Sequence, residues 1–213
     1  MLGRRARPRA HRAGIRIPVA ISARHAHLTQ ATIERLFGAG HALRLHSPLS
    51  QPGEFSAQET VTIVGPQGRL EHLRLVGPPR HADQVELARS DAVALGLDTR
   101  LRLSGDVDDT PGLVLEGPAG RVTLPHGVIL AQRHIHMSPE DAARWHLRDR
   151  EEVAVAIDSD GRDLIFEDVV VRVSAHYRTE LHLDTDEGNA AGVGPGTTAA
   201  LLEPHPGKSP ARG

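Results

Sequence analysis

Two short histidine motifs are the part of this sequence best suited to chemistry. The pattern Arg-His-x-His occurs twice, and in both copies an apolar run precedes it and a short helical pattern follows it. Residues i and i+2 of a β-strand point to the same face, so His25 and His27 project together, as do His134 and His136. Two imidazoles on one face can chelate one divalent ion. A single copy would equally describe two exposed histidines at a strand end, but two copies in the same context favour a metal.

Further ligands would come from strands in which polar and apolar residues alternate. In one such segment Gln84 and Glu86 share a face, and in another Glu180, His182 and Asp184 do, although either could be an ordinary solvated face. The four motif histidines with Glu86 and His182 could make two sites of three protein ligands, and three ligands leave zinc an open, catalytic position. The chain has no cysteine. The remaining nitrogen and oxygen ligands suit zinc, with cobalt, nickel or iron as alternatives by geometry.

A turn that ends in an arginine suggests a place for phosphate. Residues 77–79 form a rigid Gly-Pro-Pro turn, and Arg80 follows it just before the segment of Gln84 and Glu86. Arginine can donate two parallel hydrogen bonds to a phosphoryl group, although one arginine after a turn is more commonly a surface residue. No Gly-Pro turn leads into the Gly-Lys-Ser or Gly-Lys-Thr of a nucleotide-binding loop, which argues against ATP-driven phosphoryl transfer of the usual kind.

Short β-rich segments between Gly, Pro and Asp predict many short strands rather than long helices. We expect strands at residues 17–23, 60–64, 70–76, 84–87, 101–104, 113–115, 128–131, 152–157, 164–166, 169–173 and 179–184. Short helices are expected at 29–36, 90–95 and 138–145, each opening with a Ser or Thr that can cap the first turn. The motif recurs after about 109 residues, which predicts two related β units made by one duplication.

The composition predicts a chain that folds without a membrane-spanning segment. It has 213 residues, 39% of them hydrophobic, and no apolar run approaches the roughly 18 residues that a membrane span needs. Residues 1–16 hold six arginines and no acid, which leaves a net charge of −8 on the rest. We interpret residues 1–15 as a disordered basic tail and residues 204–213 as a second disordered tail. Nucleic acid as a partner is disfavoured, because the body is acidic and only five aromatic residues could stack on bases.

Many short motifs together resemble the PduL-type phosphate propanoyltransferases, a family of phosphotransacylases associated with bacterial microcompartments. The resemblance runs in the correct order from about residue 16 to residue 202. The matching segments are residues 19–28, 51–55, 59–61, 64–66, 77–80, 84–86, 104–106, 133–137 and 182–191. So many motifs in sequence make the resemblance highly specific.

The resemblance implies a fold and a set of site residues. The fold would be mainly β, with two six-stranded β-barrel domains related by an internal duplication, a few short helices, and two zinc ions between the barrels. The first domain would take residues 16–38 and 121–203, and the second residues 39–120. The implied ligands are His25, His27 and Glu86 for one zinc ion, and His134, His136 and His182 for the other. Arg80 matches the family's phosphate-binding arginine, to which we assign a catalytic role.

The implied reaction transfers a short acyl group between coenzyme A and phosphate: acyl-CoA + phosphate ⇌ acyl phosphate + CoA. Propanoyl-CoA or acetyl-CoA and phosphate would be the partners, with coenzyme A as a substrate and two Zn²⁺ ions, or Co²⁺ or Ni²⁺ as substitutes, as cofactors. We expect a cytoplasmic protein that contacts neither membrane nor nucleic acid. The resemblance leaves open the acyl chain length, the physiological direction and the oligomeric state, with a homo-oligomer as one option.

The sequence departs from the family pattern in two places. Gly188 stands where the family usually has alanine, which loosens a loop near His182 but removes no ligand. Residues 1–15 do not resemble the amphipathic helical peptide that directs family members into a microcompartment shell. Residence in a microcompartment is therefore left open.

Two other functions fit parts of the pattern. A cupin-like metal-dependent oxygenase would use His134, His136 and Glu140, which reproduce the cupin spacing of His-x-His and a glutamate four residues on. Glu140, however, follows Ser-Pro in the first turn of an expected helix, and the first copy has Ala31 at that spacing. The third interpretation is a non-enzymatic, metal-stabilised, shell-associated protein, which would have two closed coordination shells and no turnover.

Overall fold

The computed structural model describes residues 11–203, and side chains from residue 14 onward. The predicted tail 204–213 and the first ten residues of the predicted tail 1–15 lie outside the described residues, while strand β1 already begins at His11. The chain divides into two compact units. Described residues of the first unit come from Met1–Ala20, Arg133–Leu183 and Gly188–Gly213, and those of the second from Ile21–Gln132 and Asp184–Glu187. Compact units are not the same as independently folding domains, so the predicted domain ranges stay a prediction.

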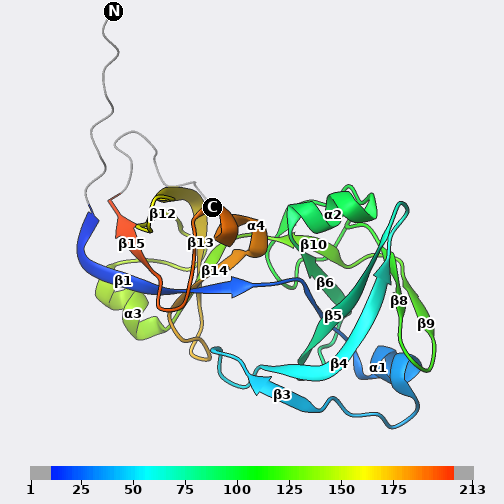
Figure 1. The fold of residues 1–213 in the computed structure, drawn as a ribbon. Helices are drawn as coiled ribbons and strands as arrows, with labels where there is room; N and C mark the ends of the chain where they lie inside the picture. Colours follow the sequence, from blue (N-terminus) through cyan, green and yellow to red (C-terminus); the bar gives the residue numbers. More distant parts are fainter. Residues whose placement is uncertain (1–10, 204–213) are drawn as a thin grey trace, which may run out of the picture. The chain divides into compact units, whose positions relative to one another are not determined.

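The first unit is a closed barrel of six strands (Figure 1). Its strands are β1 (His11–Ser22), β11 (His134–Met137), β12 (Glu152–Ile157), β13 (Leu164–Val173), β14 (Glu180–Asp184) and β15 (Thr198–Leu202). Their order is β1–β14–β11–β13–β12–β15, and β15 pairs with β1 to close the barrel. Leu181 and Leu183, two residues apart on β14, both point into the barrel and are almost fully buried.

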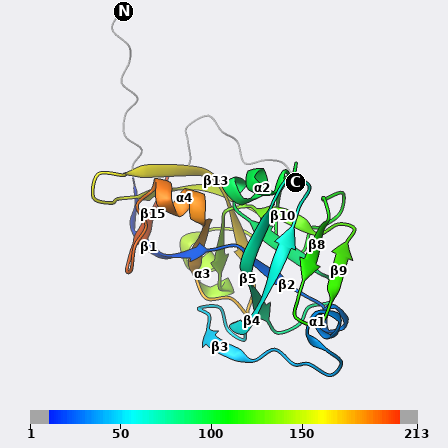
Figure 2. The same ribbon diagram turned by 45° about the vertical axis from the view of Figure 1, so that its right-hand side comes forward.

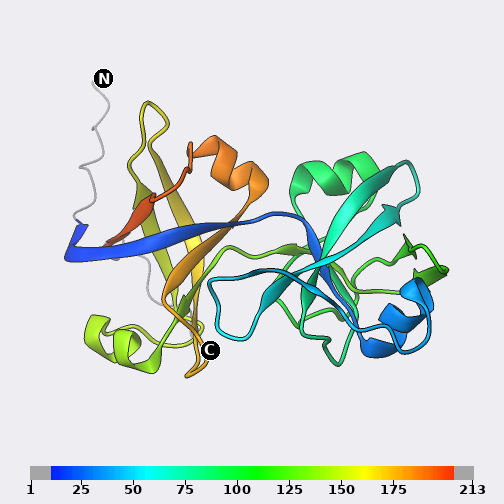
Figure 3. The ribbon, with the colours of Figure 1, turned by 60° about the horizontal axis from the view of Figure 1, so that its bottom comes forward.

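The second unit is a sheet of nine strands that curls strongly (Figures 2 and 3). Its strands are β2 (His25–His27), β3 (Leu45–Pro48), β4 (Phe55–Val64), β5 (Arg69–Gly77), β6 (Gln84–Leu87), β7 (Leu101–Arg102), β8 (Leu113–Glu116), β9 (Arg121–Leu124) and β10 (Val128–Ala131). Eight follow in the order β7–β10–β6–β2–β5–β4–β8–β9, and β3 pairs with β4 beside this path. The mainly β class is confirmed, but this curled sheet stands in place of a second six-stranded barrel, because its strand order ends at β7 on one edge and at β9 on the other.

Four short helices join the strands: α1 (Gln30–Phe37), α2 (Arg89–Leu95), α3 (Pro139–Trp145) and α4 (Thr185–Ala190). The caps of α1 and α3 are as predicted, because Thr29 Oγ1 accepts from the Thr32 amide and Ser138 Oγ from the Asp141 amide. Helix α1 lies against strand β9 (Figure 2). In the part of the chain that the structure describes, none of the helices combines the length and apolar character that crossing a membrane requires.

Helix α2 begins differently from the prediction. Its N-cap is Ala88 and not Ser90, and the Asp91 carboxylate accepts the Ala88 amide. Ser90 instead donates through its amide and its hydroxyl to Asp186. The predicted cap was wrong because Ser90 hydrogen-bonds to Asp186, which is distant in the sequence, and not to its own helix. Helix α4 was not predicted.

The two units share a strand arrangement around each His-x-His motif. Strand β2 lies between β5, which is parallel to it, and β6, which is antiparallel. Strand β11 likewise lies between parallel β13 and antiparallel β14. The strand before each motif belongs to the other unit, since β1 closes the barrel and β10 pairs with β6 in the nine-stranded sheet. A duplication followed by an exchange of one strand would leave this pattern.

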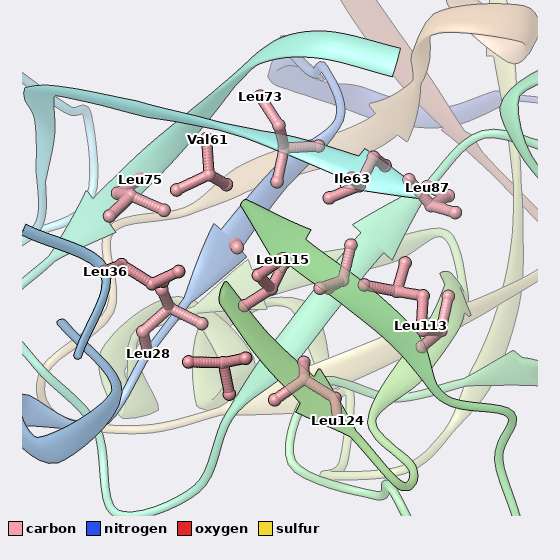
Figure 4. Close-up of a cluster of buried hydrophobic side chains, with 14 of the residues drawn as sticks. Leu28, Leu36, Val61, Ile63, Leu73, Leu75, Leu87, Leu113, Leu115 and Leu124 are labelled. Atoms are coloured by element: carbon pink, nitrogen blue, oxygen red, sulfur yellow. The ribbon is translucent and has the colours of Figure 1, made fainter. Parts of the chain in front are cut away.

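Apolar cores hold the motif strands from behind. In the second unit a cluster of buried aliphatic side chains fills the curl of the sheet (Figure 4). Ala26, between the two histidines of β2, is 0% exposed and belongs to this cluster, while Ile135 of β11 is 0% exposed in the core of the first unit. Because neighbouring strand residues point to opposite faces, these core contacts fix the direction of the histidines.

Candidate active site and metal centres

The first candidate metal centre lies where β2 pairs with β6. The register places His25 opposite Glu86 and His27 opposite Gln84. His25, His27 and Glu86 form a group whose ligand atoms all lie within 4.8 Å of one another. All three residues come from the sequence prediction, and the structure brings them together.

The two imidazoles of this group are oriented as metal ligands would be. His25 donates from Nδ1 to the Ala23 carbonyl at 2.9 Å, and this hydrogen bond leaves Nε2 with the lone pair. Nε2 of His25 lies 3.0 Å from Nε2 of His27, and each lies 3.8 Å from Glu86 Oε1. A tetrahedral zinc ion with bonds of about 2.05 Å holds two nitrogens roughly 3.3 Å apart. The donor set and its spacing therefore fit such an ion.

Electrostatics keep the buried histidine neutral. Burial lowers the pKa of His27 to about 2, with the charges of His25 and Arg80 acting in the same direction. Glu86 and a hydrogen bond to the Val76 backbone oppose this shift without reversing it. A neutral imidazole is the form that binds a metal ion, so no proton has to be removed before binding.

Arg80 is tied to the same centre through polar side chains. Its backbone amide donates to the Leu28 carbonyl at 2.9 Å, just after the His27 strand. Its guanidinium donates to Ser104 Oγ at 3.0 Å and to Glu54 Oε1 at 2.9 Å. The side chains of Arg80 and Glu54 are each about one third exposed, so a ligand in solution can reach them.

Gln84 connects this arginine to the metal group. Its amide nitrogen donates to Glu86 Oε1 at 2.6 Å and to Ser104 Oγ at 2.8 Å. Its carbonyl oxygen accepts the Gly105 amide at 2.7 Å. Gln84 is only 3% exposed. Sequence reasoning gave no role to Glu54 or Ser104, although both lie in segments of the family resemblance, residues 51–55 and 104–106.

The second candidate centre lies where β11 pairs with β14. The register places His134 opposite His182 and His136 opposite Glu180. His134, His136 and His182 form a group with ligand atoms within 4.8 Å of one another. The ring centroids of the three histidines lie 4.6 to 5.1 Å apart. The second predicted set of three is thus also brought together.

Two neighbours shape this second group. Glu180 Oε2 lies 2.9 Å from Nε2 of His182, in hydrogen-bond contact. Tyr177, which sequence reasoning missed, stacks on His136 with ring centroids 4.0 Å apart, and the Arg172 guanidinium carbon lies 5.7 Å from the centroid of the Tyr177 ring. A stacked ring limits the rotation of His136 and so fixes the direction of its nitrogens.

Two acidic residues that the sequence analysis considered as metal ligands lie outside this group. Glu140 belongs to the first turn of α3, where its side chain is 79% exposed and pairs with Arg144 at 2.7 Å. The cupin ligand set is therefore not formed. The Asp184 carboxylate accepts the Glu187 amide at the start of α4.

A mainly β protein with two histidine-rich groups, each able to hold a metal ion, and an arginine beside one of them, has the parts of a metal-dependent enzyme. Residues 18–194 match the family described as phosphate propanoyltransferase. A phosphate propanoyltransferase of Thermotoga maritima is 46% identical over 187 residues, which cover 88% of this chain and 89% of the relative. One of Salmonella typhimurium is 49% identical over 189 residues, covering 88% and 90%. The chain belongs to the phosphate propanoyltransferase family and is an acyltransferase.

Proposed function

We propose that the chain interconverts a short-chain acyl-CoA plus phosphate with acyl phosphate plus CoA, with propanoyl-CoA or acetyl-CoA as the acyl donor. The names of its relatives supply the substrate class. The observation that carries the proposal is the continuous polar connection from Arg80 through Ser104 and Gln84 to Glu86. It joins an anion-binding group to a candidate metal ligand.

Both reacting groups belong to the substrates. In the forward direction a phosphate oxygen attacks the thioester carbonyl carbon, the C–S bond breaks, and CoA leaves as a thiolate. The chain has no cysteine, and a nucleophile from the protein is not needed. The protein has to bring two anions together and stabilise the oxyanion that forms between them.

Arg80 would bind and orient the phosphate. A guanidinium carries five N–H donors, and the bonds to Ser104 and Glu54 use two, which leaves donors for a bidentate contact with phosphate. Glu54 and Ser104 hold the guanidinium plane in place before the substrate arrives. The carboxylate of Glu54 also balances the positive charge, so phosphate has to outcompete it.

We further propose that each histidine group holds one zinc ion, with cobalt or nickel as substitutes. His25, His27 and Glu86 would hold one ion, and the other ligands would be His134, His136 and His182. A divalent ion bound there supplies a Lewis acid for the acyl oxygen and a partner for the thiolate of CoA. His27 is already neutral and His25 is already oriented before such an ion binds, and both features favour its binding.

Substitutions at Arg80 test the proposal. Arg80→Ala should raise the phosphate KM by about 10- to 100-fold, because each charge-assisted hydrogen bond contributes roughly 1.5–3 kcal/mol. Arg80→Lys keeps the positive charge but not the planar pair of N–H donors, so its phosphate KM should lie between those of Arg80→Ala and the wild type. CoA release from propanoyl-CoA and acetyl-CoA in phosphate buffer gives the kinetics, and elemental analysis gives the zinc content.

Arg100→Ala removes an exposed arginine of the same unit and serves as the matched control. An Arg80→Ala variant with an unchanged phosphate KM, or one that loses zinc, would show that the role given to Arg80 is wrong. The cytoplasmic location, a homo-oligomeric state and a link to a microcompartment shell stay predictions.

A further inference from the structure

The two candidate metal centres are built on the same four-residue square. In the first, the paired strands place His25 opposite Glu86 and His27 opposite Gln84. In the second, they place His134 opposite His182 and His136 opposite Glu180. Each square therefore has a fourth corner, across from the second histidine of the motif, that is not part of the three-residue group.

Gln84 and Glu180 occupy this equivalent corner, and both contact the ligand two residues further along their own strand. Gln84 donates to Glu86 at 2.6 Å, and Glu180 lies 2.9 Å from Nε2 of His182. A hydrogen bond from Nε2–H to Glu180 also fixes the tautomer of His182 in which Nδ1 carries the lone pair. The carboxylate is 13% exposed on its side chain, so little water screens it.

The charge of the residue at each fourth corner complements the charge of the other three residues of its square. The first group already contains a carboxylate, Glu86, and a neutral amide stands beside it. The second group contains three imidazoles and no acid, and the carboxylate stands at its fourth corner. A divalent cation held by three neutral imidazoles would keep its full charge in a nearly buried place, where an uncompensated charge is costly. Each square thus carries one carboxylate.

We infer that Glu180 is the positioning residue of the second metal centre: it holds His182 and supplies the negative charge that the three histidines lack. The inference rests on the proposed function, because it assumes that a cation occupies this group. The inference goes beyond the proposed function because it assigns the compensating negative charge to Glu180, which is outside the set of three ligands. A carboxylate that hydrogen-bonds a ligating histidine makes that ligand more basic, and its loss typically costs 10- to 100-fold in metal affinity.

The experiment compares four proteins in one titration: the wild type, Glu180→Gln, His182→Ala and Glu140→Gln. Each is stripped of metal and titrated with Zn²⁺ against a coloured chelator, and the thermal midpoint of each metal-free protein is measured. Glu140→Gln is the matched control, because it removes an exposed carboxylate of the same unit that pairs with Arg144 of its own helix. His182→Ala identifies which of the two binding events belongs to the second centre.

We expect the wild type and Glu140→Gln to bind two ions with the same two affinities. Glu180→Gln keeps the shape and a hydrogen-bond acceptor but not the charge, so the event lost in His182→Ala should weaken by about 10- to 100-fold. The metal-free midpoint should stay close to that of the wild type. Unchanged zinc affinity in Glu180→Gln, or a lower metal-free midpoint without a change in affinity, would overturn the inference alone. A wild type that binds no zinc would instead overturn the metal part of the proposed function.

Discussion

Replacing Gln84 by leucine should weaken the first metal centre without touching the second. Gln84 is 3% exposed and makes three hydrogen bonds, to Glu86, Ser104 and the Gly105 amide. Leucine is slightly larger than glutamine, so no cavity forms. The substitution therefore removes the polar connection and little else.

The magnitude follows from the groups left behind. The Glu86 carboxylate loses a partner in a buried place, which costs roughly 1–3 kcal/mol, whereas Gly105 is an exposed residue whose amide can bond to water instead. Partial access to water lowers this figure, so we expect the free energy of unfolding of the metal-free protein to fall by about 2 kcal/mol. The first-centre zinc affinity should fall by about 10- to 100-fold, since Glu86 loses the hydrogen bond from Gln84 that orients it.

Urea unfolding of the metal-free protein measures the first quantity, and zinc titration against a chelator measures the second. Gln58→Leu is the control, because Gln58 is an exposed glutamine of the same unit whose amide donates to the Leu45 carbonyl. If Gln84→Leu bound zinc at the first centre as tightly as Gln58→Leu, then Gln84 would not orient Glu86. The reasoning from its hydrogen bonds would fail.

Two further predictions concern charge and metal. Burial alone raises the pKa of Glu59, but hydrogen bonds from the Arg44 amide and guanidinium and from His41 outweigh it and hold the pKa below 4.5. This carboxylate therefore stabilises the fold above pH about 4.5, and its contribution disappears as the pH falls through the lower folded value. Glu59→Gln should lose about 1.5–3 kcal/mol at pH 7 and approach the wild type in acid, measured by urea unfolding across pH. His134→Ala should lose one zinc ion together with acyl transfer; a metal-depleted yet fully active variant would contradict the assignment.

The sequence predicted several strands that are rich in β-formers and missed β15, which is not. The segments 84–87, 128–131 and 152–157 match β6, β10 and β12 residue for residue. Strand β15 is Thr-Ala-Ala-Leu-Leu, whose alanines give no β signal. Four of its five residues are buried, so the closure of the barrel makes it a strand.

The candidate metal ligands were predictable because their spacing is local, whereas their partners depend on register. A pair at i and i+2 shares a face in any strand, which is enough to single out the histidines. Which acid faces them is set by the alignment of β6 on β2. Ala26 of β2 lies opposite Val85 of β6, and both residues are 0% exposed, so the core fixes that alignment. A slip by one residue would turn Glu86 into the core and Val85 toward His25. The burial of two small apolar residues thus selects the carboxylate of the first centre.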